Sequence, residues 1–163
     1  MNAAPVQYES WILLVEDSAG DRELALHALG RGGFTGRIEQ AKDGEEALER
    51  LFCRGPWAER DPEDLPRAVL LDIKMPRVGG LEVLRELKAS ERLREVPVVM
   101  LTSSAEPSDV ATCYALGANS FVVKPVDIDE YFRSIGDVGR YWVLLNRTPT
   151  EYPRADISTP AGR

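Results

Sequence analysis

Several polar residues of this chain follow directly on short apolar runs, and their types could handle a phosphate. They are Glu16 with Asp17, Asp72, Thr102 and Lys124. Carboxylates crowded into one place repel one another and raise each other's pKa values, and a divalent cation removes that repulsion. Oxygen ligands with room for water suit Mg²⁺. The residue types therefore predict a magnesium site, provided that the fold brings them together.

The same residues predict phosphoryl transfer to a carboxylate. Asp72 is in this interpretation the nucleophile that attacks phosphorus and forms an acyl phosphate. Negative charge develops on the phosphoryl oxygens during transfer, and Mg²⁺, the Lys124 ammonium and the Thr102 hydroxyl would stabilise it. No general base is required, because the attacking carboxylate is already ionised.

The elements that must position these residues are short strands. Helical patterns separate four unbroken apolar runs, 11–15, 68–71, 98–101 and 121–123. Such a pattern predicts a parallel sheet covered on both faces, whose ligands bind at the carboxyl ends of the strands. We predict an α/β, flavodoxin-like, doubly wound (βα)5 three-layer sandwich with the sheet order 2-1-3-4-5. This order joins Glu16 and Asp17 to Asp72.

Turn and capping residues set the expected bounds of the elements. Ser18 and Asp43, each with an acid three residues later, predict two helix starts. A weaker strand is expected at 37–41 and a fifth strand at 120–123. Helices are expected near 18–30, 43–53, 80–87, 107–116 and 128–146.

The chain of 163 residues fits one domain. We divide it into an N-terminal extension (1–9), a folded domain (10–146) and a disordered tail (147–163). Residues 54–67 are polar and rich in proline, which predicts a surface loop inserted before the third strand. Cys53 and Cys113 are expected to be reduced thiols rather than a disulfide, because the chain shows no export signal.

The composition is that of a globular protein, with 44% hydrophobic and 29% charged residues. The net charge of −7 argues against non-specific binding to nucleic acids, which needs a basic face. No apolar stretch is long enough to span a bilayer, and the first ten residues lack the features of a signal peptide. We therefore expect a cytoplasmic protein without a membrane or nucleic-acid partner.

In their order along the chain, these motifs resemble the receiver domain of two-component response regulators. The resemblance covers about residues 10–146, and each motif alone is weak, whereas the complete set at strand ends is specific. It implies a signalling protein that catalyses only its own phosphorylation and dephosphorylation. The matching motifs are Glu16-Asp17, Asp72 followed by Met75-Pro76 and Gly79-Gly80, Thr102-Ser103 and Lys124-Pro125.

The resemblance also implies a role for the acidic residues. Asp72 is the implied phosphoacceptor, which takes phosphate from a histidine of a sensor kinase. Glu16 and Asp17 would hold Mg²⁺ together with Asp72 and the backbone carbonyl of Lys74. A lysine at position 74 departs from the commoner neutral residues of the family, and its ammonium is expected to alter the lifetime of the phosphoryl group.

Two further residues would contact the phosphoryl group, namely Thr102 and Lys124. Phe121 matches the aromatic switch position, whose ring turns inward when Thr102 moves toward the phosphate. The bond between Lys124 and Pro125 is implied to be cis, a form that proline makes accessible.

The last expected helix carries an apolar stripe at spacings of four and three residues, which is typical of a helix seam. We expect this stripe to form a homodimer and the receiver surface to carry the output; a single broad core face is the alternative. The stripe consists of Tyr131, Ile135, Val138, Trp142 and Leu145.

A narrower group is also similar to this chain, namely the single-domain regulators paired with bacterial and cyanobacterial phytochromes. The similarity lies in the long loop before the third strand and in the aromatic pairs Tyr131-Phe132 and Tyr141-Trp142 of the last helix. It implies a phytochrome-type kinase as the partner.

Other interpretations remain open at this point. The chain could be a phosphorelay shuttle that passes its phosphate to a histidine phosphotransfer protein, or an interaction protein that needs no phosphate. A phosphotransferase acting on small metabolites usually carries a second aspartate two residues after the nucleophile, where this chain has Lys74. Asp17 and Ser18 could form only a helix cap, and Asp72, Thr102 and Lys124 could be turn or edge residues.

Overall fold

The computed structural model describes residues 10–149, which form a five-stranded parallel sheet in the order β2-β1-β3-β4-β5. Helices alternate with the strands along the chain. The elements are β1 (Trp11–Val15), α1 (Ala19–Arg31), β2 (Arg37–Ala41), α2 (Gly44–Leu51), η1 (Gly55–Trp57), β3 (Ala68–Asp72), α3 (Gly80–Ala89), β4 (Val98–Thr102), α4 (Pro107–Ala115), β5 (Ser120–Val123), α5 (Ile128–Gly139) and η2 (Arg140–Leu145).

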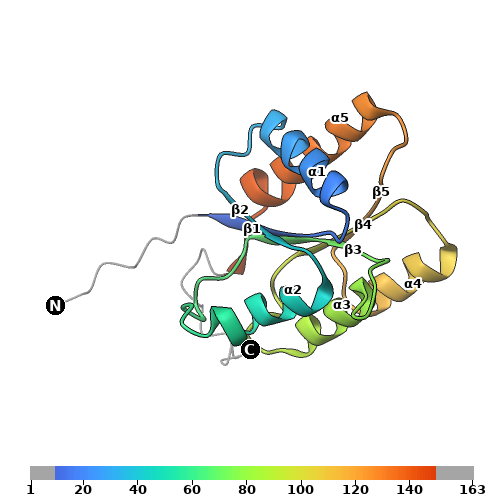
Figure 1. The fold of residues 1–163 in the computed structure, drawn as a ribbon. Coiled ribbons are helices and arrows are strands. Elements are labelled where there is room, and N and C mark those ends of the chain that lie inside the picture. Colours follow the sequence, from blue (N-terminus) through green and yellow to red (C-terminus); the bar gives the residue numbers. More distant parts are fainter. Residues whose placement is uncertain (1–9, 150–163) are drawn as a thin grey trace, which may run out of the picture.

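The sheet is the middle of three layers, with α1 and α5 on one face and α2, α3 and α4 on the other (Figure 1). Alternate side chains of β1 enter the two cores: Leu13 and Val15 join the core under α2 and α3, whereas Ile12 and Leu14 join the core under α1 and α5. Both faces of a central strand are thus dry, which explains its unbroken apolar sequence. The predicted fold class and strand order are confirmed.

Side-chain caps begin the first two helices where the sequence predicts them. The backbone N–H of Asp21 donates to Oγ of Ser18 at 3.3 Å, and that of Glu46 donates to Oδ1 of Asp43 at 2.8 Å. Each cap satisfies a backbone donor that the helix itself leaves without a partner. The caps also fix where the chain leaves the sheet edge that carries the acidic residues.

The last helix differs from the prediction of one continuous helix over 128–146. Its α-helical part ends at Gly139, and a π-helical turn follows over Arg140–Leu145. The N–H of Asn146 donates to the carbonyl of Tyr141, five residues earlier, at 2.6 Å. The wider turn changes which side chains face the sheet, because π-helical spacing differs from α-helical spacing. Within this turn Val143 is buried, whereas Leu145 is 65% exposed.

The inserted segment 54–67 lies at the surface but is anchored to the sheet. The indole N–H of Trp11 donates to Asp64 at 2.8 Å, and Asp64 also accepts a hydrogen bond from Arg37 at 2.9 Å. The guanidinium of Arg60 lies 4.5 Å from the centroid of the Trp11 ring and pairs with Glu39 of β2. These contacts tie the segment to β1 and β2, the latter being an edge strand of the sheet.

Both cysteines are free, with Cys113 buried and Cys53 half-buried, as expected. Within residues 10–149, no helix is both long enough and apolar enough to cross a bilayer. The expected N-terminal extension lies outside the described residues, and so does most of the expected tail, of which only 147–149 are described.

Candidate functional site

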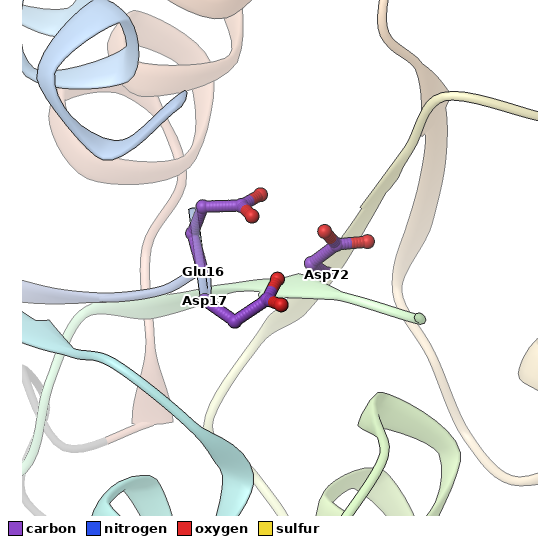
Figure 2. Close-up of side chains that lie close together, drawn as sticks. All are labelled: Glu16, Asp17 and Asp72. Atoms are coloured by element: carbon purple, nitrogen blue, oxygen red, sulfur yellow. The ribbon is translucent and has the colours of Figure 1, made fainter. Parts of the chain in front are cut away.

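Three carboxyl groups meet at the carboxyl edge of the sheet (Figure 2). Glu16 and Asp17 follow β1, and Asp72 ends β3, the neighbouring strand, whose Leu71 pairs with Val15. One carboxylate oxygen of each acid lies within 4.8 Å of the others. The structure thus brings together the acids that the strand pattern placed at one edge.

Lys124, the residue after β5, adds a positive charge to this group of acids. Its Nζ lies 2.6 Å from Oε2 of Glu16 and 3.6 Å from Oδ2 of Asp72. The backbone N–H of Lys124 donates to the carbonyl of Thr102 at 2.7 Å, which extends the pairing of β4 with β5 to the site. Because the side chains of Glu16 and Lys124 are only 4% and 12% exposed, water screens this ion pair weakly.

Burial and the neighbouring charges shift the pKa values of both Glu16 and Lys124. Burial and the neighbouring carboxyl of Asp72 raise the pKa of Glu16 above its ordinary value, against the hydrogen bond from Lys124. Burial alone would lower the pKa of Lys124, but the hydrogen bond to Glu16 and the charge of Asp72 outweigh it and raise this pKa. Lys124 therefore stays protonated at neutral pH. Three carboxylates against one ammonium leave two formal negative charges, the charge that one divalent cation balances.

The donor set fits a hard cation such as Mg²⁺. All three candidate side chains offer carboxylate oxygens, and Asp17 is exposed, so that water can fill the remaining coordination positions. In the part of the chain that the structure describes, this is the group of acidic side chains whose ligand atoms converge closely enough for a metal ion.

A close backbone approach shapes the loop that follows Asp72. A Cβ atom on Gly80 would lie 2.0 Å from the carbonyl oxygen of Asp72, so only glycine allows α3 to start here. The backbone N–H of Lys74 donates to Oδ1 of Asp72 at 3.3 Å, and the ammonium of the same lysine reaches Oγ of Ser104 at 3.2 Å. Lys74 thereby connects the loops after β3 and β4 beside the acidic group.

Thr102 and Phe121 lie on the strands that the sequence predicts, β4 and β5. Their side chains, however, make contacts outside the group of acids. The buried hydroxyl of Thr102 donates to the carbonyl of Ser104 at 3.1 Å, within the turn after β4. Phe121 is half-buried against the core under α2 and α3. The expected cis bond between Lys124 and Pro125 is wrong, since no cis peptide bond occurs in residues 10–149. The small energy difference between the two isomers of a proline peptide allows either form.

The apolar stripe of the last helix is divided between core and surface. Tyr131 and Ile135 are 7% and 0% exposed and belong to the core under α1 and α5, against which Val138 and Trp142 also pack. Of the five residues, Leu145 is the one with a large exposed side chain. A surface for a second copy would accordingly be narrower than the sequence predicts.

Sequence reasoning missed two residues that support the site. The hydroxyl of Ser104 accepts a hydrogen bond from the Lys74 ammonium, and its backbone carbonyl accepts one from the Thr102 hydroxyl. Arg22 of α1 donates from Nη1 to the backbone carbonyls of Glu16 and Asp17 at 2.8 and 3.2 Å. A cation in the first turn of a helix is unfavourable, and that signal could have marked Arg22 for attention.

Comparison with known proteins finds a matching family model and similar relatives. Residues 12–135 match the family model described as the response regulator receiver domain. The probable methanogenesis regulatory protein FilR2 of Methanothrix harundinacea (strain 6Ac) is 43% identical over 138 residues, which span 85% of this chain and 86% of the relative.

Solved structures agree with this match. The bacteriophytochrome response regulator AtBRR is 48% identical with a TM-score of 0.68, over 86% of this chain and 100% of that chain. The Mn²⁺-bound form of the response regulator Rcp1, a protein known from Synechocystis sp., is 30% identical with a TM-score of 0.79, over 86% of this chain and 99% of that chain.

Proposed function

Since the chain belongs to the response regulator receiver family, we propose that it accepts a phosphoryl group from a sensor histidine kinase on Asp72, in a Mg²⁺-dependent reaction. The observation that carries the proposal is the convergence of three carboxylates and Lys124 at one sheet edge, with the two formal negative charges that a divalent cation would balance. The protein acts in this proposal as a signalling module and not as an enzyme with a separate substrate.

The chemistry assigns a task to each residue. A carboxylate oxygen of Asp72 forms the new bond to phosphorus while the bond from phosphorus to the donor nitrogen breaks, and the histidine leaves with that electron pair. The Lys124 ammonium, 3.6 Å from Asp72, is near enough to follow the charge onto the phosphoryl oxygens. The Thr102 hydroxyl would have to leave Ser104 to reach the same oxygens, which couples phosphorylation to the loop after β4.

The metal would be held by Asp17, Asp72 and Glu16, together with the backbone carbonyl of Lys74. When bound, it would neutralise the carboxylates and polarise the phosphoryl oxygens. The Mn²⁺-bound structure of Rcp1, a relative with the same fold, supports a divalent metal in this proposal. Lys124 and the loop after Asp72 orient the acids around it.

The expected partner is a kinase of the phytochrome type. This part rests on the likeness to AtBRR, which is described as a bacteriophytochrome response regulator. FilR2, of similar identity, is described as a probable methanogenesis regulatory protein, so this level of identity does not by itself assign the pathway. Phosphotransfer from a purified bacteriophytochrome kinase, compared under red and far-red light, tests the assignment; no transfer in either state would contradict it.

Three further expectations belong to the proposal. Phe121 would follow the movement of Thr102, because its half-buried ring lies on the neighbouring strand. A homodimer would use the exposed end of the last helix around Leu145, next to the partly buried Trp142. The protein would work in the cytoplasm, and passage of the phosphate back to a histidine phosphotransfer protein remains the alternative output.

Incubation with Mg²⁺ and acetyl phosphate, followed by intact mass measurement, tests the proposal. The wild-type protein should gain one phosphate, whereas Asp72→Asn and the wild type with EDTA should gain none. A phosphate on Asp72→Asn, or none on the wild type, would contradict the assignment. Asp64→Asn is a matched control, because it removes a carboxylate that anchors the inserted segment far from the site.

A further inference from the structure

Arg22 folds back from the first turn of α1 onto the turn that carries two of the acids. The same nitrogen, Nη1, donates to the carbonyl oxygen of Glu16 at 2.8 Å and to that of Asp17 at 3.2 Å. The backbone N–H of Arg22 donates to Ser18, the cap residue of the helix. One side chain thus connects the start of α1 to both peptide units of the acidic turn.

The place of Arg22 in the helix argues that these contacts have a purpose. The N-terminal end of a helix carries partial positive charge, so a cation in the first turn is disfavoured there. Hydrogen bonds from a charged donor to two carbonyl oxygens offset that cost. An arginine at this position is therefore explained by the carbonyls that it holds rather than by helix formation.

The two acids of the turn differ in how they are oriented. The carboxylate of Glu16 has its own anchors, the Lys124 ammonium at 2.6 Å and the Ser18 N–H at 3.1 Å. Asp17 is exposed, yet its carboxyl group lies toward Asp72 (Figure 2). The peptide planes of the turn, which Arg22 contacts, set the direction in which the Asp17 side chain leaves the backbone.

We propose that Arg22 is a positioning residue for the metal. By fixing the carbonyls of Glu16 and Asp17, it directs the carboxylate of Asp17 toward Asp72, so that a metal ion can bind between the two carboxylates. The inference rests on the proposed function, because it assumes that this position takes a divalent cation. In this proposal Arg22 acts through the backbone of the turn, whose carbonyls it contacts, and not as a ligand of the metal.

A purely electrostatic role and a positioning role of Arg22 predict opposite changes in metal binding when the side chain is removed. A guanidinium beside three carboxylates repels a divalent cation, so its removal would strengthen metal binding. A positioning role predicts that its removal weakens metal binding, by roughly tenfold if it resembles other residues that orient metal ligands. The sign of the change therefore separates the two roles.

Isothermal titration with Mg²⁺ alone measures this sign. Arg22→Met should raise the Kd by about tenfold, and Arg22→Lys, whose ammonium can donate to both carbonyls, should recover most of the affinity. Arg85→Met removes an exposed arginine of α3 and should leave the Kd unchanged. An unchanged or lower Kd for Arg22→Met would overturn the inference. If Arg22→Met melts near the assay temperature, Arg22→Gln takes its place with the same expected direction.

The rate of phosphorylation by acetyl phosphate distinguishes this inference from the proposed function. At saturating Mg²⁺, Arg22→Met should approach the wild-type rate, because Asp72 and Lys124 are unchanged, whereas at low Mg²⁺ it should be slower. A wild type that binds no Mg²⁺ and gains no phosphate defeats the proposed function itself. If the wild type is phosphorylated and Arg22→Met is phosphorylated equally fast at low Mg²⁺, only the proposed role of Arg22 is contradicted.

Discussion

The ammonium of Lys124 lies 2.6 Å from the Glu16 carboxylate, although the two residues are 108 positions apart in the sequence. The contact joins the end of β5 to the end of β1 across two intervening strands. Both side chains are almost fully covered, and the carboxylate of Glu16 depends on Lys124 for a partner of opposite charge.

Removal of the lysine should expose that dependence. Lys124→Met leaves the Glu16 carboxylate without its cation, so we expect the free energy of unfolding to fall by about 2 kcal/mol without Mg²⁺. Saturating Mg²⁺ should return part of this loss, because a ligand that binds the folded state stabilises it. Urea unfolding with and without Mg²⁺ measures both effects. Lys42→Met, at an exposed position, is the control, and equal losses in the two variants would contradict the prediction.

Acid should reveal the charge network that anchors the inserted segment. Burial would raise the pKa of Glu39, but Arg60, with Arg37 and Arg50, outweighs burial and holds this pKa below its ordinary value of 4.5. A carboxyl group with a depressed folded pKa contributes stability above its unfolded pKa and loses it as the pH falls through the folded value. Glu39→Gln should therefore be less stable than the wild type at pH 7, and the gap should narrow below pH 4.5.

Chemical unfolding of both proteins between pH 7 and the acid limit measures that gap. Glu59→Gln, at an exposed position of the same inserted segment, should follow the wild type throughout. A gap for Glu39→Gln that stays constant with pH would show that its carboxylate contributes nothing through charge.

The lysine beside the acceptor should protect the phosphorylated state. Lys74 reaches from the loop after β3 to Ser104 of the loop after β4, beside Asp72, and in our proposal its side chain hinders the approach of water to the phosphoryl group. We expect the phosphoryl group of Lys74→Ala to decay about twofold faster or more, because water exclusion slows hydrolysis. Loss of the phosphate followed by intact mass gives the half-life, with Lys42→Ala as the control. An unchanged half-life removes this role.

Self-association should depend on the end of the last helix. Leu145 is 65% exposed beside the exposed Tyr141 and Leu144, so a glutamate there should weaken a homodimer without disturbing the core. Sedimentation velocity of the wild type and of Leu145→Glu tests this expectation. Val126→Glu, at a fully exposed apolar position beyond β5, should sediment as the wild type does. A monomeric wild type at all concentrations would contradict the dimer.

The ends of the strands could be predicted because burial alone dictates them. A strand covered on both faces must be apolar throughout, so the first polar residue marks the sheet edge, as at Glu16 and Asp72. Parallel pairing in the predicted strand order then brings these ends together. The caps at Ser18 and Asp43 are local signals of the same kind.

Features that depend on particular side-chain contacts or on local helix geometry could not be predicted. The inserted segment looks like a plain loop in the sequence, because its anchor, the bond from Trp11 to Asp64, joins residues 53 positions apart. The π-helical turn after Gly139 lies within an ordinary helical pattern, so the period of the sequence could not reveal it. The turn contacts of Thr102 and the hydrogen bonds of Arg22 likewise follow from side-chain positions rather than from spacing.

A crystal grown with Mn²⁺ and beryllium fluoride, a mimic of the phosphoryl group, tests the phosphoacceptor site most directly. An anomalous difference map should place the metal against the carboxylates of Asp17 and Asp72, with beryllium on a carboxylate oxygen of Asp72 and the Lys124 ammonium on a fluoride. Metal bound away from these acids, or beryllium on another residue, would contradict Asp72 as the phosphoacceptor.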